Sequence, residues 1–310
     1  MKSNRTQLII SGAAIVLGFA AIFGLGNFLE KALVPFPEDF DDGDLAINGS
    51  RLKGFALGME GLIADWYWVR SLQYIGDKMI KSGSDFQNID DLSVLNPRLL
   101  YPYLETATDL DPHFIAAYSY GAIVLPAIDP TKAIAITEKG IANNPNEWRL
   151  YQHLGYIYWR IGNYEKAAAT YEKGSEIADA APFMKMMAAS MLTEGGSRDT
   201  SRKIFQRMLD DSDEQNIRLT MTLHLNEIDS LDERAAIDAA LADFRQKTGR
   251  CASSLNEIFP MLRGIRLPGE RDFRIDAANR LVDPTDAPYL LDKENCRAAL
   301  DLEHTKLPRK

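Results

Sequence analysis

Small side chains recur at a constant spacing of 34 residues through the middle of the chain, and this repeat constrains the fold more than any other feature. The pairs are Gly121 and Gly155, Ala133 and Ala167, and Gly140 and Gly174. The spacing divides this region into windows at residues 114–147, 148–181 and 182–215. No strictly alternating apolar run occurs in them, so we expect no sheet there. A fixed period with two helices per unit is typical of a helical solenoid.

The central window, residues 148–181, shows why these residue types recur. Gly155 and Ala167 lack bulk where two helices would cross, so the backbones can approach each other. Gly162-Asn163 supplies the turn between the helices, and Tyr171 packs back from the second one. Each helix pair is left with an apolar face that the next pair covers, so stacking buries a continuous core.

The same window resembles the tetratricopeptide-repeat (TPR) family. Its pattern L-G-x-x-Y, then G-x-Y-x-x-A, then Y stands at Leu154, Gly155, Tyr158, Gly162, Tyr164, Ala167 and Tyr171. The flanking windows depart from the pattern at Ala117, Lys185 and Ser201. The resemblance implies an all-α, TPR-like solenoid of three to four helix pairs, in which residues 57–110 form a further pair with an expanded loop. A generic helical bundle is the alternative.

The resemblance also implies a protein-binding scaffold whose first helices line a concave groove. The groove positions project onto Arg149, Gln152, Tyr156, Trp159 and Arg160 in the central window, and onto Ile115, Tyr118, Ala122, Leu125, Phe183, Met186, Ser190 and Thr193 beside it. Two arginines beside Trp159 predict binding of a carboxylate or an acidic peptide. In the alternative interpretation, Tyr156 and Trp159 pack between repeats and the arginines belong to a solvated face.

The N-terminal region predicts a membrane anchor. Leu8 to Leu29 is a stretch of 22 residues without a formal charge, long enough to cross the hydrocarbon core of a bilayer. Lys2 and Arg5 precede it, which favours a cytoplasmic N-terminus and export of the rest. A cleaved signal peptide and a buried core helix are the alternatives, but the run is long for a signal peptide and no good cleavage site follows it.

Between the anchor and the repeats, proline and aspartate predict an extended linker at residues 34–56. A helix is expected from about Leu57 to Lys81, followed by a polar loop to Leu95. Asn96-Pro97 predicts an N-cap and first helical position for a helix that ends near Leu110. Further along, Ser230 and Glu233 form a capping-box pattern, which predicts the start of a capping helix that runs to about Lys247.

The residue pattern changes in the C-terminal part of the chain and predicts a small, irregular module. Proline and glycine dipeptides punctuate short apolar pieces after Gly249. Over about fifty residues this segment resembles, weakly, the C-terminal region of the major pseudopilins of type II secretion. Cys251 and Cys296 both lie in the module. In an exported protein a disulfide between them would stabilise it by about 3–4 kcal/mol; two unrelated thiols are the alternative.

Composition narrows the classes of function. The net charge of −9 disfavours nucleic acid as the main partner, since phosphate binding needs clustered Lys and Arg. Two cysteines exclude a Cys₄ zinc site, and the four histidines show no metal-binding spacing. The sequence has no nucleophile elbow, no phosphate-binding glycine loop and no dinucleotide fingerprint. We therefore expect no catalytic residue, no cofactor and no bound metal.

Together these patterns predict a single-pass inner-membrane protein with its C-terminal bulk in the periplasm. The expected parts are a cytoplasmic stub and transmembrane anchor at residues 1–33, a linker at 34–56, the solenoid at 57–229, and the capping helix with the C-terminal module at 230–310. The expected role is a scaffold or assembly factor that binds a protein partner of a cell-envelope complex. The alternatives are a constitutive subunit of a membrane machine and an enzyme with a site on the C-terminal module.

Overall fold

The computed structural model describes residues 15–26, 28, 49–83 and 90–308. Helices dominate these residues. In chain order the helical segments from Gly49 onward are α2 (Gly49–Lys53), α3 (Glu60–Lys81), η3 (Ser93–Leu95), α4 (Leu100–Leu110), α5 (Ile115–Val124), η4 (Leu125–Ala127), α6 (Pro130–Asn143), α7 (Trp148–Arg160), α8 (Tyr164–Ser175), α9 (Phe183–Glu194), α10 (Arg198–Asp210), α11 (Gln215–Thr248), η5 (Leu255–Ile258) and α12 (Phe259–Leu262).

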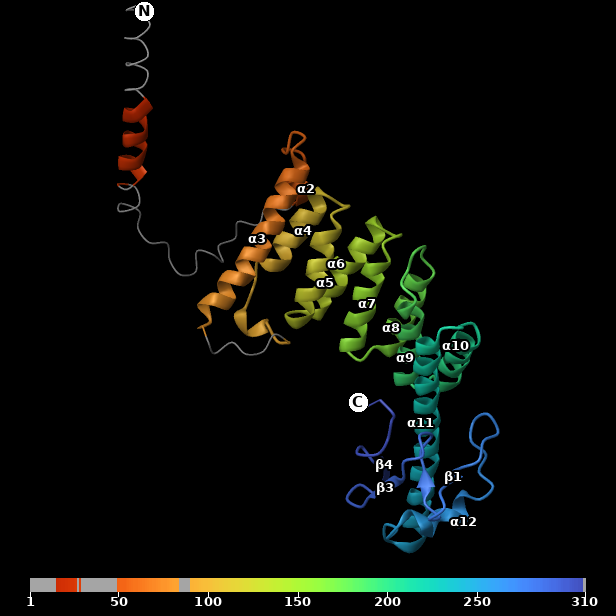
Figure 1. Cartoon of the computed structure of the whole chain (residues 1–310). Helices are drawn as coiled ribbons and strands as arrows, with labels where there is room; N and C mark the ends of the chain where they lie inside the picture. Colours follow the sequence, from red (N-terminus) through yellow and green to blue (C-terminus); the bar gives the residue numbers. More distant parts are fainter. Residues whose placement is uncertain (1–14, 27, 29–48, 84–89, 309–310) are drawn as a thin grey trace, which may run out of the picture.

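The three repeat windows each contain one pair of packed helices. These pairs are α5 with α6, α7 with α8, and α9 with α10, and each packs on the next. A fourth pair, α3 with α4, precedes them. Figure 1 shows the pairs side by side in a curved row that runs from α3 to α11. No strand occurs in residues 114–215, all of which the structure describes. The prediction of a helical solenoid with a period of 34 residues is confirmed.

The apolar core of the described residues is divided into a series of clusters along this row. One cluster joins α3 to α6 and reaches α7 through Leu150 and Ile157. A second joins α7, α8 and α9, and a third joins α9, α10 and the first half of α11 around Phe205 and Ile228. The fourth fixes the C-terminal module to the second half of α11. Each cluster is completed by the next element in the chain, as solenoid stacking requires.

Glycine permits the closest helix contact at Gly155 of α7. A Cβ atom at this position would lie 2.7 Å from the ring of Tyr171 on α8, closer than real Cβ contacts. Tyr171 is itself only 2% exposed, so the ring has no free space to move into. The crossing predicted for the central window therefore depends on the missing side chain.

The region before the repeats differs from its prediction in two places. A short helix, α2, lies inside the predicted linker and packs against α4, since Gly49 is buried against Thr106 and Asp109. The helix predicted to start at Asn96-Pro97 starts at Leu100, and Asn96 instead ends the turn η3 in a left-handed conformation. Asn tolerates that conformation, so the residue that looked like an N-cap closes the preceding turn.

The predicted anchor lies only partly within the described residues. Residues 15–26 are helical, and the side chains described in this segment are exposed. The remaining residues of the predicted span, 8–14, 27 and 29, lie outside the described ranges, as do residues 29–48 of the stub and linker. Among the helices that the structure describes, none combines the length and the apolar character needed to cross a bilayer.

The capping box at Ser230 and Glu233 was a wrong prediction. Helix α11 is continuous for 34 residues, and both side chains lie near its middle, completely buried. The helix ends at Gly249, as the sequence indicated, with a left-handed φ of 74°. The predicted boundary between the solenoid, ending at residue 229, and the capping helix, starting at residue 230, therefore falls inside α11. This one helix belongs to both parts.

The C-terminal module contains two short antiparallel hairpins, so the chain is not entirely helical. Strand β1 (Arg274–Ile275) pairs with β2 (Leu281–Val282), with Ile275 opposite Leu281. Strand β3 (Tyr289–Asp292) pairs with β4 (Arg297–Leu300), with Tyr289 opposite Leu300. Both hairpins lie beside the far half of α11 (Figure 1). Their strands have two to four residues, too short for a strand pattern in the sequence.

Candidate partner-binding groove

A groove of about 580 Å³ opens on the surface formed by the first helices of the three central pairs. Side chains of α7 form its floor, α5 and η4 form one wall, and α9 forms the other. The residues that line it are Asp90, Leu92, Ala122, Ile123, Val124, Ala127, Gln152, His153, Tyr156, Arg160, Tyr171, Phe183 and Met187. Five of the positions predicted from the family pattern are among them: Ala122, Gln152, Tyr156, Arg160 and Phe183.

On α7 and α9, lining residues follow one another at intervals of about one helical turn. Gln152, Tyr156 and Arg160 follow each other at intervals of four on α7, and Phe183 and Met187 do so on α9. Residues four apart lie above one another on a helix face, so α7 and α9 each present a ridge of side chains to the groove. Neighbouring first helices then place these ridges next to each other, and the hollow lies between them.

A loop from the first helix pair forms one edge of the groove. The Leu92 N–H donates to the carbonyl of Ala127 at 2.8 Å, which attaches the loop to the end of η4. The Arg160 guanidinium donates to the Asp90 carbonyl at 3.3 Å, which attaches it to the end of α7. The loop that the sequence predicted as an expanded connection therefore contributes Asp90 and Leu92 to the site.

The groove is mainly apolar and carries little charge of its own. Alanine, isoleucine, valine, phenylalanine and methionine side chains make up most of its walls. His153 is half-buried in the floor, and burial lowers the pKa of its imidazole below the ordinary value of 6.5. The uncharged form of the imidazole therefore predominates at pH 7. A surface of this kind suits the apolar side of a peptide or helix better than an acidic segment.

Several predicted groove residues lie elsewhere. Tyr118 is fully buried, with its ring against Gly140, so it belongs to the core. Met186 packs on the cluster with α10 and α11, and its neighbour Met187 faces the groove instead. One residue corresponds to a rotation of about 100° around a helix, which moves a side chain from one neighbour to another. Leu125 is buried, and Ile115, Ser190 and Thr193 do not line the hollow.

The two arginines predicted to flank Trp159 do not converge. Arg149 forms an ion pair with Glu147 at 3.1 Å and lies over the ring of Trp148. It is eleven residues from Arg160, about 16 Å along the helix axis. Trp159 is 41% exposed and packs beside Tyr156, with 5.5 Å between ring centroids, but it does not line the groove. The carboxylate clamp was a wrong prediction.

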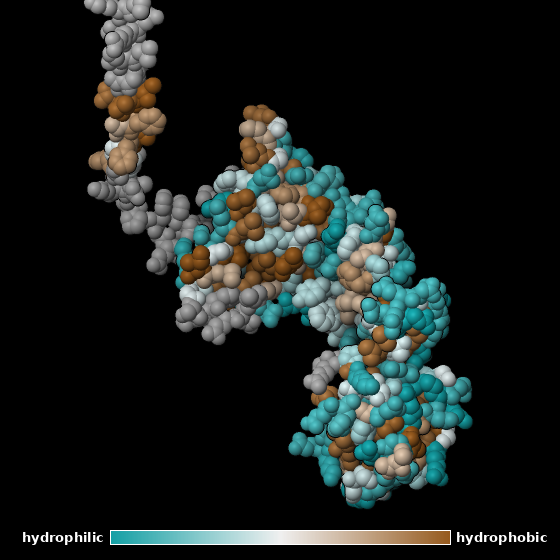
Figure 2. All heavy atoms as spheres, in the orientation of Figure 1, coloured by the Kyte–Doolittle hydropathy of each residue, from teal (hydrophilic) through white to brown (hydrophobic). Residues whose placement is uncertain are grey.

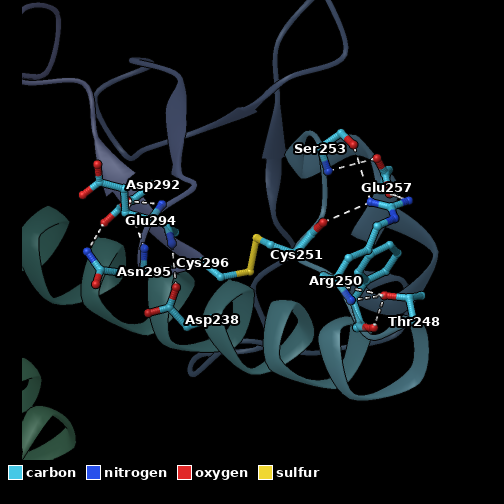
Figure 3. Close-up of a disulfide and its surroundings, with 12 residues drawn as sticks. Asp238, Thr248, Arg250, Cys251, Ser253, Glu257, Asp292, Glu294, Asn295 and Cys296 are labelled. Carbon is cyan, nitrogen blue, oxygen red and sulfur yellow. Dashed lines mark hydrogen bonds and ion pairs between the residues drawn. A yellow bond between two sulfur atoms is a disulfide. The ribbon is translucent and has the colours of Figure 1, made fainter.

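A disulfide joins the two cysteines of the C-terminal module. Cys251, just after α11, bonds to Cys296, in the turn between β3 and β4, with 5.8 Å between their Cα atoms. In Figure 3 the bond lies along one side of α11. On one side of it Arg250 pairs with Glu257 at 2.9 Å; on the other, Asp238 of α11 accepts from the Ala298 N–H at 2.7 Å. The module is thus attached covalently and by hydrogen bonds to the helix it covers.

A buried ionic cluster joins α10, α11 and the C-terminal module. Its centre is Glu233, which accepts from the Tyr289 hydroxyl at 2.7 Å and from Arg271 at 3.2 Å. Burial raises the pKa of the Glu233 carboxyl above its ordinary value of 4.5, against the opposing effects of Tyr289, Arg274 and Arg271. One turn earlier, Asp229 bonds both Arg202 of α10 and Arg271. Sequence reasoning missed this cluster, because its members come from three separate segments.

The histidines lie apart from one another. His113 hydrogen-bonds Asn144, His224 stacks on Phe205, and His304 bonds Asp301. Within residues 15–26, 28, 49–83 and 90–308, no group of three or more His, Cys, Asp or Glu side chains is arranged to hold a metal ion. Five of the predicted site residues line the groove, which is therefore the candidate functional site of this protein.

Comparison with known proteins agrees with the geometry of the central pair. The tetratricopeptide repeat family model matches residues 149–180, which cover α7 and α8. No curated protein matches the chain. The match places Gln152, Tyr156 and Arg160 on the first helix of the recognised repeat, and the same helical packing continues on both sides. Residues 149–180 match a tetratricopeptide repeat, and the residues that the structure describes around this match are mainly helical.

Proposed function

We propose that this protein is a membrane-anchored scaffold or assembly factor that binds a protein subunit of a cell-envelope complex in the groove of α5, α7 and α9. The observation that carries the proposal is the apolar hollow of about 580 Å³ on the first helices, centred on the recognised repeat. TPR repeats generally bind protein partners. Exposed aromatic and arginine side chains such as Tyr156 and Arg160 are the types that anchor protein interfaces.

The walls of the groove favour a particular kind of partner. The neutral His153 and the apolar side chains of Ile123, Phe183 and Met187 match an amphipathic helix or an extended apolar segment. Arg160 already donates to the Asp90 carbonyl, so it fixes the edge of the groove as well as facing it. We assign no catalytic residue to this site, and the proposed role is docking.

Two observations support an anchored, exported protein. The uncharged stretch Leu8 to Leu29 continues on both sides of residues 15–26, whose described side chains are exposed and largely apolar. Apolar side chains without protein neighbours suit a lipid environment. The Cys251–Cys296 disulfide suits an oxidising compartment, because thiols are kept reduced in the cytosol. We therefore propose that the solenoid and the C-terminal module lie on the periplasmic side of an inner membrane.

A matched pair of substitutions on α7 tests the groove. Tyr156 and Trp159 are 42% and 41% exposed and lie one turn apart, but only Tyr156 lines the hollow. A photocrosslinking residue at Met187 in the full chain identifies the bound segment in membranes. We expect Tyr156→Ala to weaken that crosslink about tenfold or more, as loss of an aromatic anchor does, and Trp159→Ala to leave it unchanged.

The reverse pattern, with Trp159→Ala as the damaging change, would show that partners bind another face of α7. A crosslinking residue at Lys173 on α8 serves as the background control, because it lies on the second helix of the pair. Crosslinks of equal yield at Lys173 and Met187 would show that the partner does not bind preferentially in the groove.

A further inference from the structure

The loop between α2 and α3 carries an apolar surface that nothing in the described chain covers. Phe55 and Leu57 are 80% and 89% exposed, and Met59 follows at the start of α3. Gly58 and Leu57 both have positive φ angles, so the backbone turns sharply here and the loop projects from the fold. Figure 2 shows this projection as a hydrophobic tip at the end of the solenoid.

The surface continues along one face of α3. Leu62, Trp66 and Val69 follow Met59 at alternating intervals of three and four residues, so all four lie on the same side of the helix. Their exposed fractions run from 41% to 67%. The opposite side of α3 packs on α4 through Ala64, Tyr67 and Tyr74. One side of α3 therefore packs in the solenoid. The other side is exposed, although its side chains are apolar like those of a protein core.

The shape and charge of this surface indicate which kind of partner it binds. The tip is convex, so it does not form a groove that would hold a peptide. Arg51 and Lys53 flank it and are exposed. Five basic side chains outnumber three acidic ones between residues 49 and 83, in a chain whose net charge is −9. A convex apolar tip with basic neighbours is the arrangement that enters the interface of an anionic bilayer, and Trp66 is the side chain most favoured at that depth.

We propose that the α2–α3 tip and the exposed face of α3 dock on the surface of the bilayer. The inference rests on the proposed function, in which the anchor ends near Leu29. Nineteen residues separate Leu29 from Gly49, and a chain of that length spans at most about 65 Å. The anchor thus confines α2 and α3 close to the lipid, and a modest affinity of the tip then holds the first helix pair against the membrane.

Fluorescence quenching by lipid tests this contact. The chain has two cysteines, both in the disulfide, so a cysteine introduced at Leu57 is the one free thiol. The full chain with Leu57→Cys, labelled with nitrobenzoxadiazole, is reconstituted in vesicles of phosphatidylethanolamine, phosphatidylglycerol and doxyl-labelled lipid. We expect blue-shifted emission and loss of most of the signal by quenching. The control is the same label at Leu290, which is 46% exposed in the C-terminal module.

Three results would overturn the inference. An unshifted, unquenched label at position 57 leaves the tip in water. A blue shift without lipid quenching assigns the surface to a second copy of the chain or another protein. Equal quenching at positions 57 and 290 shows adsorption without a preferred surface. Extraction with alkaline carbonate tests the membrane anchor separately. If the chain is extracted but the label at position 57 is still quenched, the anchored function is wrong and the contact of the tip with lipid is supported.

Discussion

Gly155 is the position at which a single added methyl group has the clearest consequence. Its absent Cβ leaves room for the Tyr171 ring at a contact of 2.7 Å. We expect Gly155→Ala to lower the free energy of unfolding by about 1–2 kcal/mol, because overpacking at the helix crossing outweighs the gain in helix propensity. Urea denaturation followed by circular dichroism measures the change.

The control for this substitution is Gly76→Ala in the C-terminal third of α3, where a Cβ would meet nothing within 4 Å. Without a clash, the alanine should stabilise the protein by about 0.8–1.0 kcal/mol, the difference in helix propensity between the two residues. Equal effects at the two glycines would contradict the close helix crossing.

Glu233 makes stability depend on pH in an unusual direction. Burial raises its pKa in the folded protein above the ordinary value of 4.5, so the folded state holds the proton more tightly than the unfolded state. The contribution of this group is therefore fully present below pH 4.5 and is lost as pH rises through the raised pKa. In Glu233→Gln that dependence should vanish, so the stability of the wild type relative to the variant should rise as pH falls to 4.5.

Thermal or urea unfolding of both proteins, from neutral pH down to pH 4.5 with the disulfide intact, checks the sign. Other carboxyls, such as Asp276 and Asp292, have lowered pKa values and act in the opposite direction, but they are common to both proteins and cancel in the difference. A difference that shrinks on acidification would show that the arginines around Glu233 outweigh its burial.

At the scale of elements, the ion pairs on α11 differ in what they connect. Asp229 bonds Arg202 of α10 and Arg271 of the C-terminal module, and all three side chains are at most 25% exposed. Asp229→Ala should cost about 2–4 kcal/mol, because it leaves two arginines without their shared partner in a poorly hydrated site. Asp243→Ala on the same helix should cost about 0.3–0.5 kcal/mol, since its pair with Lys247 at 2.7 Å is exposed.

Urea titration of the two variants and the wild type measures both values. Similar losses for Asp229→Ala and Asp243→Ala would mean that the buried pair contributes no more than a surface pair. Asp229 would then add little to the attachment of α10 and of the C-terminal module to α11.

The helices of the repeats were predictable because their signals are local. Gly155, Ala167 and Tyr171 are close in the sequence, and each has a role within one helix pair that the period repeats. The Ser230–Glu233 pattern misled for the opposite reason. Tyr289, which bonds both side chains, lies 56 and 59 residues further along the chain, so nothing near residue 230 distinguishes a buried cluster from a cap.

The groove was predictable in place but not in detail. The family pattern identified α7 and the residues Gln152, Tyr156 and Arg160, whose role in binding stays a prediction. It assigned Met186 instead of Met187, because the rotation of α9 is set by its packing on α10 and α11 and two adjacent methionines give no clue to it. The contribution of Asp90 and Leu92 to the groove was missed, because the polar sequence of this predicted loop does not indicate which helices it packs against.

Across the whole molecule, stability is distributed along the row of clusters. The disulfide closes a loop of 45 residues in the last cluster, which is worth about 4 kcal/mol by the entropy of loop closure. Reduction should therefore increase amide hydrogen exchange in β3 and β4 strongly, while leaving α7 and α8 nearly unchanged, because the clusters share few residues.

Hydrogen exchange read by mass spectrometry, with and without a reductant, measures this difference. Uniform loss of protection from α7 to β4 would show that the protein unfolds as one cooperative unit, against the serial arrangement of its cores. Retained protection in β3 and β4 would show that hydrogen bonds such as Asp238 to the Ala298 N–H hold the module without the covalent bond.

The bond between Cys251 and Cys296 also determines how the protein responds to tension. A pull between the N-terminal helix and the residues after Cys296 passes directly from one sulfur to the other, so the intervening segment carries no load. Those residues would otherwise add about 150 Å of extensible chain. In an oxidising compartment the C-terminal end therefore transmits force to α11 with little slack, and a reductant converts the same connection into a long elastic tether.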